Sequence, residues 1–334
     1  MNRPARLDLR LDIEHWPLRA PFRITGYTFT VLEVLVARLG DGEHQGQGEA
    51  AGVYYLGDRP QGMKAQVEAV RGAIEAGISR EELQRLLPAG GARNAVDCAL
   101  WDLEARQRRT PAWRLAGLSE PRPLVTTYTL GADAPQVMAD AARAFPAARA
   151  LKLKLTGEPV DLERVLAVRA ARPDVWMGVD ANQGLDRDSY AALAPVLAQA
   201  DVRLLEQPFP RGAEALMDGL ASAVPIAADE SVQIFEDIAP LAGRVQAINI
   251  KLDKCGGLTE GLRMAREAHR LGLQVMVGNM MGTALAMAPA HLLAQLCEVV
   301  DLDGPIVLAA DREPGIVHEH GLVSCPPAIW GGGA

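Results

Sequence analysis

Three acidic residues in the second half of the chain each end a short apolar run: Asp180, Glu206 and Asp229. If these runs are neighbouring parallel strands, the carboxylates meet at one edge of the sheet, where without a cation they would repel one another. Oxygen ligands favour a hard cation, and Mg²⁺ fits once water or substrate completes its octahedron. We therefore predict that these three residues hold one Mg²⁺ per subunit.

Two lysines in other runs have the spacing to move a proton. Lys154 lies in the second run of the series and Lys251 ends the sixth, so in an eight-stranded barrel they stand on opposite walls. A carbon held near the metal can lose a proton to one lysine and regain one from the other, which inverts the carbon. Lys152 lies on the same side of its strand as Lys154, and we expect its charge, together with Mg²⁺, to lower the pKa of Lys154. The metal would stabilise the enediolate formed when a carbon beside a carboxylate is deprotonated.

The elements that must position these side chains are eight short apolar runs from residue 124 onward. They are Leu124–Leu130, Leu151–Leu155, Trp176–Asp180, Val202–Glu206, Pro225–Asp229, Ala247–Lys251, Gln274–Gly278 and Glu298–Asp301. Segments of helical character separate most of them, which indicates an α/β fold with parallel strands closed into a barrel. After Asp303 no helical period follows. The prediction is a (β/α)₇β modified TIM barrel.

The first part of the chain has a different texture, strands followed by helices, which is typical of a small α+β domain. The expected strands are Leu7–Ile13 and Thr28–Leu39, the helices Met63–Ala76 and Asn94–Arg108, and the irregular stretches Pro17–Tyr27 and Gly48–Gly62. We predict three parts: a capping domain over 1–117, the barrel with the active site over 118–310, and a tail over 311–334 that returns to the cap.

Composition narrows the class of partner. The 334 residues carry 34 basic and 42 acidic side chains, a net charge of −8, and only 4% are aromatic. Neither a basic surface nor base-stacking side chains are indicated, so small molecules are the expected partners rather than nucleic acid or membrane. Four scattered cysteines and the absence of a signal-like N-terminus or a long apolar stretch predict a cytoplasmic protein with reduced thiols. We expect it to form a homo-oligomer.

Five motifs in order along the chain give a resemblance to a known family. They are Leu-Lys-Leu-Lys-Leu (151–155), Gly-Val-Asp-Ala-Asn-Gln-Gly (178–184), Leu-Glu-Gln-Pro (205–208), Ala-Asp-Glu-Ser (228–231) and Asn-Ile-Lys-Leu-Asp-Lys-Cys-Gly-Gly (249–257). Together they resemble the enolase superfamily, in particular its muconate-lactonizing-enzyme subgroup, over nearly the whole chain. The resemblance implies a Mg²⁺-dependent enzyme in which Lys154 and Lys251 act as paired bases.

Within that subgroup the chain is similar to dipeptide epimerases, which carry Asp-x-Asp after the eighth strand. Here the motif is Asp301-Leu302-Asp303, and two carboxylates suit the α-ammonium of a dipeptide. An Asp-Gly turn at Gly304 is the structural alternative. The resemblance further implies substrate contacts from Thr129, Lys152, Asn279 and Met281. At position 279 the commoner family residue is cysteine or serine.

Two cap segments, Arg23–Tyr27 and Val53–Gly57, are expected to choose the substrate side chain. Family members that act on Ala-Glu carry an arginine in the first segment, where this chain has Gly26 or Tyr27. An acidic and an apolar or aromatic second residue therefore both stay open.

The predicted function is an isomerase that inverts an α-carbon of a dipeptide by two-base 1,1-proton transfer. N-acylamino acid racemase, o-succinylbenzoate synthase and muconate cycloisomerase would use the same metal and lysines. Asp301 and Asp303 separate these from a dipeptide epimerase, because acylated or amine-free substrates carry no ammonium. A non-catalytic ligand-binding barrel is the remote alternative, since binding alone needs no paired bases.

Overall fold

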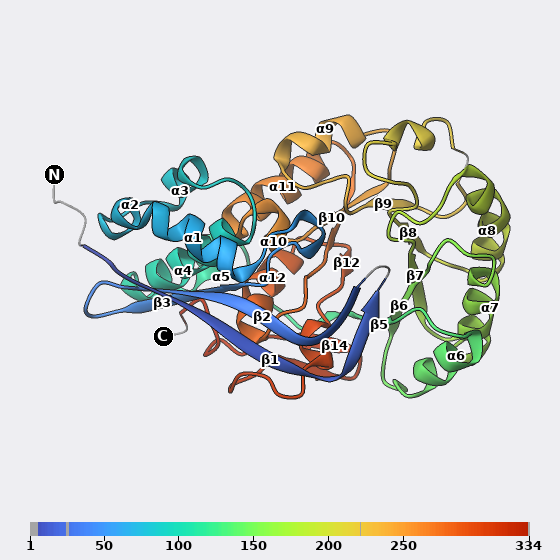
Figure 1. The fold of residues 1–334 in the computed structure, drawn as a ribbon, viewed down its shortest axis with the longest axis horizontal. Coiled ribbons are helices and arrows are strands. Elements are labelled where there is room, and N and C mark those ends of the chain that lie inside the picture. The colour runs from blue at the N-terminus through green and yellow to red at the C-terminus, as the bar shows by residue number, and fades with distance from the viewer. Residues whose placement is uncertain (1–5, 25–26, 221, 333–334) are drawn as a thin grey trace.

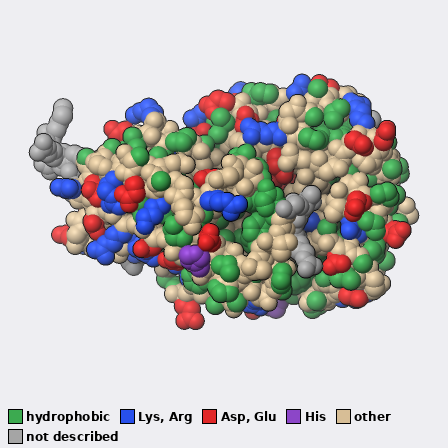
Figure 2. All heavy atoms as spheres, in the orientation of Figure 1, with side chains coloured by type: hydrophobic (Ala, Val, Ile, Leu, Met, Phe, Trp, Pro, Cys, Tyr) green, Lys and Arg blue, Asp and Glu red, His purple; other side chains and the backbone are tan. Residues whose placement is uncertain are grey.

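A computed structural model describes residues 6–24, 27–220 and 222–332. Figure 1 shows a sheet-and-helix cap formed by the N-terminal part of the chain beside a larger barrel whose helices surround its strands. On the face drawn in Figure 2, acidic and basic side chains are interspersed. Across the described residues, no helix is both long and apolar enough to cross a lipid bilayer.

The cap sheet has three antiparallel strands in the order β1-β2-β3: β1 (Asp8–Ile24), β2 (Tyr27–Gly40) and β3 (Gln45–Ala50). Both predicted strands are present, but the predicted loop Pro17–Tyr27 is wrong over most of its length, because β1 continues to Ile24. Its pairing with β2 shifts register between Pro17 and Phe22, and this irregularity accommodates the two prolines in the extended hairpin.

Strand β3 was also missed, since its sequence Gln-Gly-Gln-Gly-Glu-Ala has little β propensity. The packing of the strand against a helix explains why two of its residues are glycine. A methyl group added at Gly46 or Gly48 would lie 2.2–2.3 Å from backbone atoms of the helix beneath, α4 (Gly91–Gln107). Close approach of strand and helix therefore requires glycine at both positions.

The remaining cap helices are short. They are α1 (Pro60–Ala69), α2 (Arg71–Glu75), α3 (Arg80–Leu86) and α5 (Ala112–Leu115), with a 3₁₀ turn η1 (Tyr54–Leu56). The predicted helix Met63–Ala76 is thus broken at Val70, and the predicted helix Asn94–Arg108 begins three residues earlier, at Gly91. The apolar face of α4 packs on the cap sheet.

The barrel prediction is confirmed: eight parallel strands follow one another in sequence order from β5 to β12. They are β5 (Thr127–Leu130), β6 (Ala150–Lys154), β7 (Trp176–Asp180), β8 (Leu204–Glu206), β9 (Ile226–Ala228), β10 (Ala247–Ile250), β11 (Gln274–Val277) and β12 (Val299–Val300). Each lies within one predicted apolar run, except that β6 begins one residue before its run, at Ala150. The first run, however, is divided, because Leu124–Val125 forms β4 in a different sheet.

Helices connect most of these strands on the outside of the barrel (Figure 1). They are α6 (Pro135–Arg143), α7 (Asp161–Ala171), α8 (Arg187–Gln199), α9 (Ile238–Leu241), α10 (Leu252–Cys255), α11 (Leu258–Arg270) and α12 (Ala284–Ala294), with 3₁₀ turns η2 (Glu214–Met217) and η3 (Phe235–Asp237). After β12 the described chain contains no further α-helix, as the (β/α)₇β form predicts; the turn η4 (Gly304–Val307) and two short strands follow instead. Leu204, Ala227, Ala247 and Met276 form a separate buried cluster of strand residues.

The seam between the first and eighth strands is closed by side chains. In the described chain, backbone pairing runs from β5 to β12 without joining the two ends of the sheet. Thr126 Oγ1 instead accepts a hydrogen bond from Leu302 N at 3.0 Å, and Thr127 Oγ1 donates to Asp301 at 2.5 Å. The Asp-x-Asp motif therefore lies at this seam.

The segment after the barrel contacts the cap. Strands β13 (Val317–Glu319) and β14 (Leu322–Ser324) form a small antiparallel sheet with β4. Further contacts reach cap residues: Ala309 N donates to Pro17 O at 2.9 Å, and the Trp330 indole donates to Cys98 O at 3.0 Å. We retain the division at residues 117 and 310 as a proposal.

Buried polar contacts dock the helical side of the cap onto the barrel. The Arg93 guanidinium, from α4, donates to the carbonyls of Cys255 and Gly256 at 2.5 and 3.2 Å. Asp253, two residues after Lys251, accepts the N–H of Gly52 at 2.8 Å. This contact ties the cap segment that follows β3 to the end of the sixth barrel strand.

The docking contact at Asp253 makes stability depend on pH. Burial raises the pKa of this carboxyl to about 7, from about 3.9 in an unfolded chain. The contribution of the group to stability is therefore complete below pH about 4 and is lost as pH rises through about 7. Asp253→Asn removes this dependence. Relative to wild type, the variant should gain about 2 kcal/mol in free energy of unfolding between pH 5 and pH 8.

Urea unfolding at both pH values measures this difference. The exposed Asp218→Asn serves as the control, and parallel pH profiles for wild type and Asp253→Asn would contradict the raised pKa of the Asp253 carboxyl.

Candidate active site

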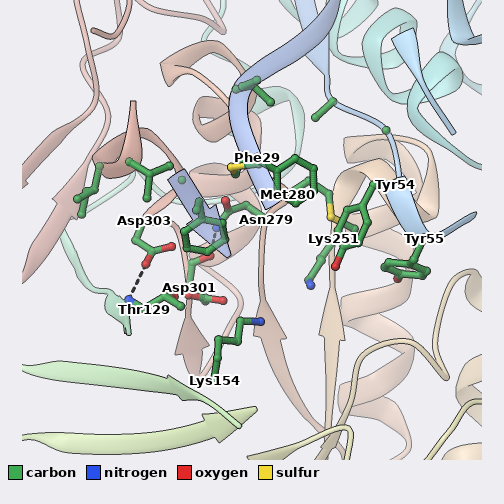
Figure 3. A pocket seen from close by; sticks show the side chains of 18 of the residues that line it. Phe29, Tyr54, Tyr55, Thr129, Lys154, Lys251, Asn279, Met280, Asp301 and Asp303 are labelled. Carbon is green, nitrogen blue, oxygen red and sulfur yellow. Dashed lines mark hydrogen bonds between the residues drawn. The ribbon is translucent and has the colours of Figure 1, made fainter. Parts of the chain in front are cut away.

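A cavity of about 240 Å³ lies where the carboxyl ends of the barrel strands face the cap (Figure 3). Its cap wall is aromatic: Tyr54 stands edge-on to Phe29 and to Tyr55, with ring centroids 5.5 and 5.2 Å apart. Its barrel wall is polar. Nine of the eleven predicted site residues line it: Thr129, Lys152, Lys154, Asp229, Lys251, Asn279, Met281, Asp301 and Asp303. The other two, Asp180 and Glu206, are buried outside this lining.

The two predicted specificity segments differ in what can be described. Tyr54 and Tyr55, from Val53–Gly57, line the cavity. Of Arg23–Tyr27, residues 25 and 26 and the side chains at 23 and 24 lie outside the described residues. Tyr27 packs edge-on to Tyr54, with ring centroids 4.6 Å apart, and so supports the aromatic wall from outside the cavity lining.

The paired lysines enter the cavity from different strands. Lys154 ends β6, the second barrel strand, and Lys251 directly follows β10, the sixth. Figure 3 shows their amino groups reaching the same space from different directions. Lys154 Nζ lies 2.6 Å from Asp180, and Lys251 Nζ lies 2.6 Å from Asp229. Burial alone would lower the pKa of Lys251, but Asp229 and Glu206 outweigh it and raise that pKa well above its usual value.

The three acids lie at the ends of successive strands. Asp180 and Glu206 are direct partners in the β7–β8 ladder, and Asp229 follows β9. All three are at most 1% exposed. Burial and the nearby Asp180 raise the pKa of Glu206 to about 7. Burial also opposes ionisation of Asp229, but Lys251 and Lys254 hold its pKa well below the usual range.

The chemistry of this donor set fits Mg²⁺. Buried carboxylates on neighbouring strands offer only oxygen, and burial together with the charge of Asp180 raises the pKa of Glu206, so a cation at this place would favour its ionised form. Among the described residues, no three acidic, histidine or cysteine side chains are already arranged around a common point. Lysine ammonium groups stand between the acids instead, so a bound cation would take over part of their role.

The Lys152 ammonium group is buried among three carboxylates. Its Nζ lies 2.8 Å from Glu206, 2.8 Å from Asp301 and 3.3 Å from Asp180. Although burial opposes its charge, these carboxylates raise the pKa of Lys152 well above its usual value. Lys152 is therefore a fixed positive charge that links the acids of β7 and β8 to the seam.

The two aspartates of the Asp-x-Asp motif differ in their surroundings. Asp301 is buried, and its two oxygens accept from Thr127 and Lys152. Asp303 is only partly buried and accepts the N–H of Thr129 at 2.7 Å, an arrangement visible in Figure 3. Burial and the charge of Asp301 raise the pKa of Asp303 to about 6. Asp303 is thus the more accessible of the two to a substrate ammonium.

Asn279 uses its amide on the protein itself. Its Nδ2 donates to the carbonyl of Asp301 at 2.5 Å, so it fixes the backbone of the seam. Its place in the cavity lining agrees with the predicted substrate contact, but the direct contact itself stays a prediction.

Sequence reasoning missed residues that hold the acids in place. Lys254 Nζ donates to Asp229 Oδ1 at 2.5 Å, to Asp229 O at 2.6 Å and to Asn249 O at 3.0 Å. Asn249 Nδ2 donates to Glu206 Oε1 at 2.7 Å. Their spacing was a usable signal: Asn249 precedes Lys251 by two and shares its strand face, and Lys254 follows one helical turn later.

Comparison with known proteins agrees with this geometry. Residues 8–117 match the model described as mandelate racemase/muconate lactonizing enzyme, N-terminal domain, and residues 136–328 match the enolase C-terminal domain-like model. The chain belongs to the mandelate racemase/muconate lactonizing enzyme family of the enolase superfamily. Members of this family among its relatives are enzymes named as epimerases.

Three proteins similar to this chain are epimerases or have homology to dipeptide epimerases. The L-Ala-D/L-Glu epimerase of Escherichia coli K12 is 39% identical over 305 residues, 91% of this chain and 95% of the relative. A solved enolase family member from Agrobacterium tumefaciens, with homology to dipeptide epimerases and with sodium and L-Ala-L-Glu bound, has a TM-score of 0.94 and 42% identity, covering 97% of this chain and 100% of that one. A dipeptide epimerase from Methylococcus capsulatus, in complex with Mg and L-Arg-D-Lys, has a TM-score of 0.89 and 30% identity, covering 97% and 99%.

Proposed function

We propose that this enzyme is a Mg²⁺-dependent dipeptide epimerase that inverts an α-carbon by two-base 1,1-proton transfer. The observation that carries the proposal is the pair Lys154 and Lys251 in one cavity with an accessible carboxylate, Asp303, at its far side. The lysines supply the proton chemistry, and Asp303 suits a free amino terminus. Relatives that act on dipeptides support the same reading.

In the proposed reaction, one lysine in its neutral form removes the α-proton from one face of the carbon, and the other, in its ammonium form, delivers a proton to the opposite face. The roles exchange for the reverse direction. Asp180, Glu206 and Asp229 would hold one Mg²⁺ per subunit, which supplies positive charge that favours the enediolate. Lys152 adds a fixed positive charge close to these acids.

Side chains at the seam and around the cavity would position the substrate. Asp303 would receive the α-ammonium, while Asp301 fixes Lys152. Thr129, Asn279 and Met281 would shape the surrounding wall. The aromatic cap wall would contact the second residue of the dipeptide, so its side chain is selected there.

The test of the function is proton exchange with inversion. The protein is incubated with Mg²⁺ in D₂O with a panel of L,L-dipeptides and of N-acyl amino acids. Mass gain at one α-carbon together with the new diastereomer supports the proposal. Exchange with N-acyl amino acids but with none of the dipeptides would favour an N-acylamino acid racemase instead.

The Asp-x-Asp motif gives a second, more specific prediction. Asp303→Asn should reduce kcat/KM for a dipeptide about 10- to 100-fold, mainly through KM, because a charged hydrogen bond to the ammonium is lost. For an N-acetylated dipeptide, which carries no ammonium, the same substitution should change kcat/KM little. Steady-state polarimetry with both substrates measures this ratio. Equal losses on both substrates would contradict the assigned role.

Assembly and location complete the proposal. We propose a homo-oligomer in the cytoplasm. Light scattering coupled to size-exclusion chromatography tests the first, and cell fractionation the second.

A further inference from the structure

A fourth carboxylate lies beside the proposed cation site and has no assigned role. Glu230 directly follows Asp229 after strand β9 and lines the cavity. Glu230 is only 4% exposed. Nevertheless, Oε2 of Glu230 has no hydrogen-bond partner among the described protein groups, and Oε1 has one long contact, 3.5 Å from Asn182 Nδ2.

The surroundings of Glu230 do not balance its charge. The charged side chains that act on it are Asp229, Asp180, Lys251 and Lys254. Both lysines are already paired with Asp229, at 2.6 and 2.5 Å. A buried carboxylate whose two acidic neighbours share these ammonium groups is costly for the folded protein. A bound ligand with positive charge would offset this cost.

One residue connects Glu230 with the other acids. Asn182 donates its N–H to Asp180 Oδ1 at 2.9 Å and turns its side-chain amide toward Glu230. Its backbone φ of 42° lies in the left-handed region, which asparagine tolerates better than most residues. Asn182 therefore fixes the segments after β7 and β9 relative to each other, with Asp180 and Glu230 on the same side.

We propose that Glu230 is a fourth carboxylate of the Mg²⁺ site and acts on the cation through Oε2, directly or through a bound water. The inference rests on the proposed function, since it takes Mg²⁺ as the resident ion. Mg²⁺ keeps several waters when proteins bind it, and carboxylates that orient such waters raise affinity. The alternative occupant is a cationic group of the substrate, which Asp303 already serves from the seam.

The test measures cation affinity and stability separately. Glu230→Gln and Glu230→Asp are compared with wild type by calorimetric titration with MgCl₂ after chelation, and by thermal unfolding in EDTA. We expect Glu230→Gln to weaken Mg²⁺ binding about 10- to 100-fold. In EDTA its Tm should rise by about 1–3 °C, because an unbalanced buried charge has been removed. Glu230→Asp should lie between wild type and Glu230→Gln in affinity.

Glu260→Gln is the matched control. Glu260 is similarly buried, at 7% exposure, but lies outside the cavity and has a partner in Arg263 at 3.4 Å. Its replacement should leave Mg²⁺ affinity unchanged and should not raise the Tm.

Three outcomes would overturn the inference. Unchanged Mg²⁺ affinity in Glu230→Gln would show that Glu230 does not serve the cation, and an accompanying loss limited to dipeptides with basic side chains would make it a substrate contact. A lower Tm in EDTA would give Glu230 a structural role instead. If wild type itself neither binds Mg²⁺ nor exchanges the α-proton of any substrate, the proposed function fails, and this inference with it.

Discussion

Replacing Lys251 with alanine is expected to reduce epimerisation at least about 10³-fold, because one face of the substrate carbon loses its proton donor and acceptor. Lys154 stays in the cavity, on a different strand and paired with Asp180. It can still exchange the α-proton of one epimer with solvent. The variant should therefore incorporate deuterium into one epimer without producing the other.

The reciprocal variant sharpens this test. Lys154→Ala should exchange the opposite epimer, again without inversion. Mass spectrometry and NMR in D₂O follow exchange, and polarimetry follows inversion. Lys64→Ala, in cap helix α1 and away from the cavity, is the control with unchanged rates. Exchange of the same epimer by both lysine variants would contradict a two-base reaction.

Asp229→Asn is expected to have the largest effect on stability together with loss of Mg²⁺ binding. The Asp229 carboxylate faces two buried ammonium groups, Lys251 at 2.6 Å and Lys254 at 2.5 Å. Removing one partner from a buried ion pair costs about 3–5 kcal/mol, because the remaining charges are uncompensated. The free energy of unfolding should fall by about this amount, and epimerisation should be lost with the metal.

The control for this variant is the same substitution in an exposed pair. Asp218 pairs with Arg244 at 2.7 Å, with side chains 50% and 35% exposed. Asp218→Asn should cost about 0–1 kcal/mol and leave Mg²⁺ binding intact. Urea unfolding and calorimetry measure both quantities. Equal losses in the two variants would mean that Asp229 is not held as the structure indicates.

The barrel and its strand ends were predictable because apolar runs and charged residues alternate in a fixed order. Runs such as Trp176–Asp180 are buried on both faces, so their sequences are almost continuously apolar. A charged residue at the end of such a run therefore marks the end of the strand. The cap was harder. The strand β3 was missed because its glycines, which allow close approach to α4, have low β propensity. In β1 the prolines predicted a loop, whereas strand pairing resumes after a register shift.

The pairing of charges inside the site was not predictable, because it depends on distances across the barrel. Lys152 and Asp301 are separated by 149 positions in the sequence but meet at 2.8 Å. The motif therefore suggested that Asp301 and Asp303 act alike, whereas the structure gives them different partners. Likewise, the unpartnered oxygen of Glu230 is a property of three-dimensional packing that no spacing rule reveals.

The side-chain seam between β5 and β12 has an evolutionary consequence. The lysines and acids stand on strands joined by continuous backbone pairing, whereas Thr126, Thr127, Asp301 and Asp303 close a junction that has no such pairing in the described chain. Under the proposed function, substitutions at the junction would change which substrate binds without moving the strands that carry the two lysines. Proton transfer and substrate specificity would thus depend on different parts of one barrel. Selection could then change the specificity while it preserves the reaction.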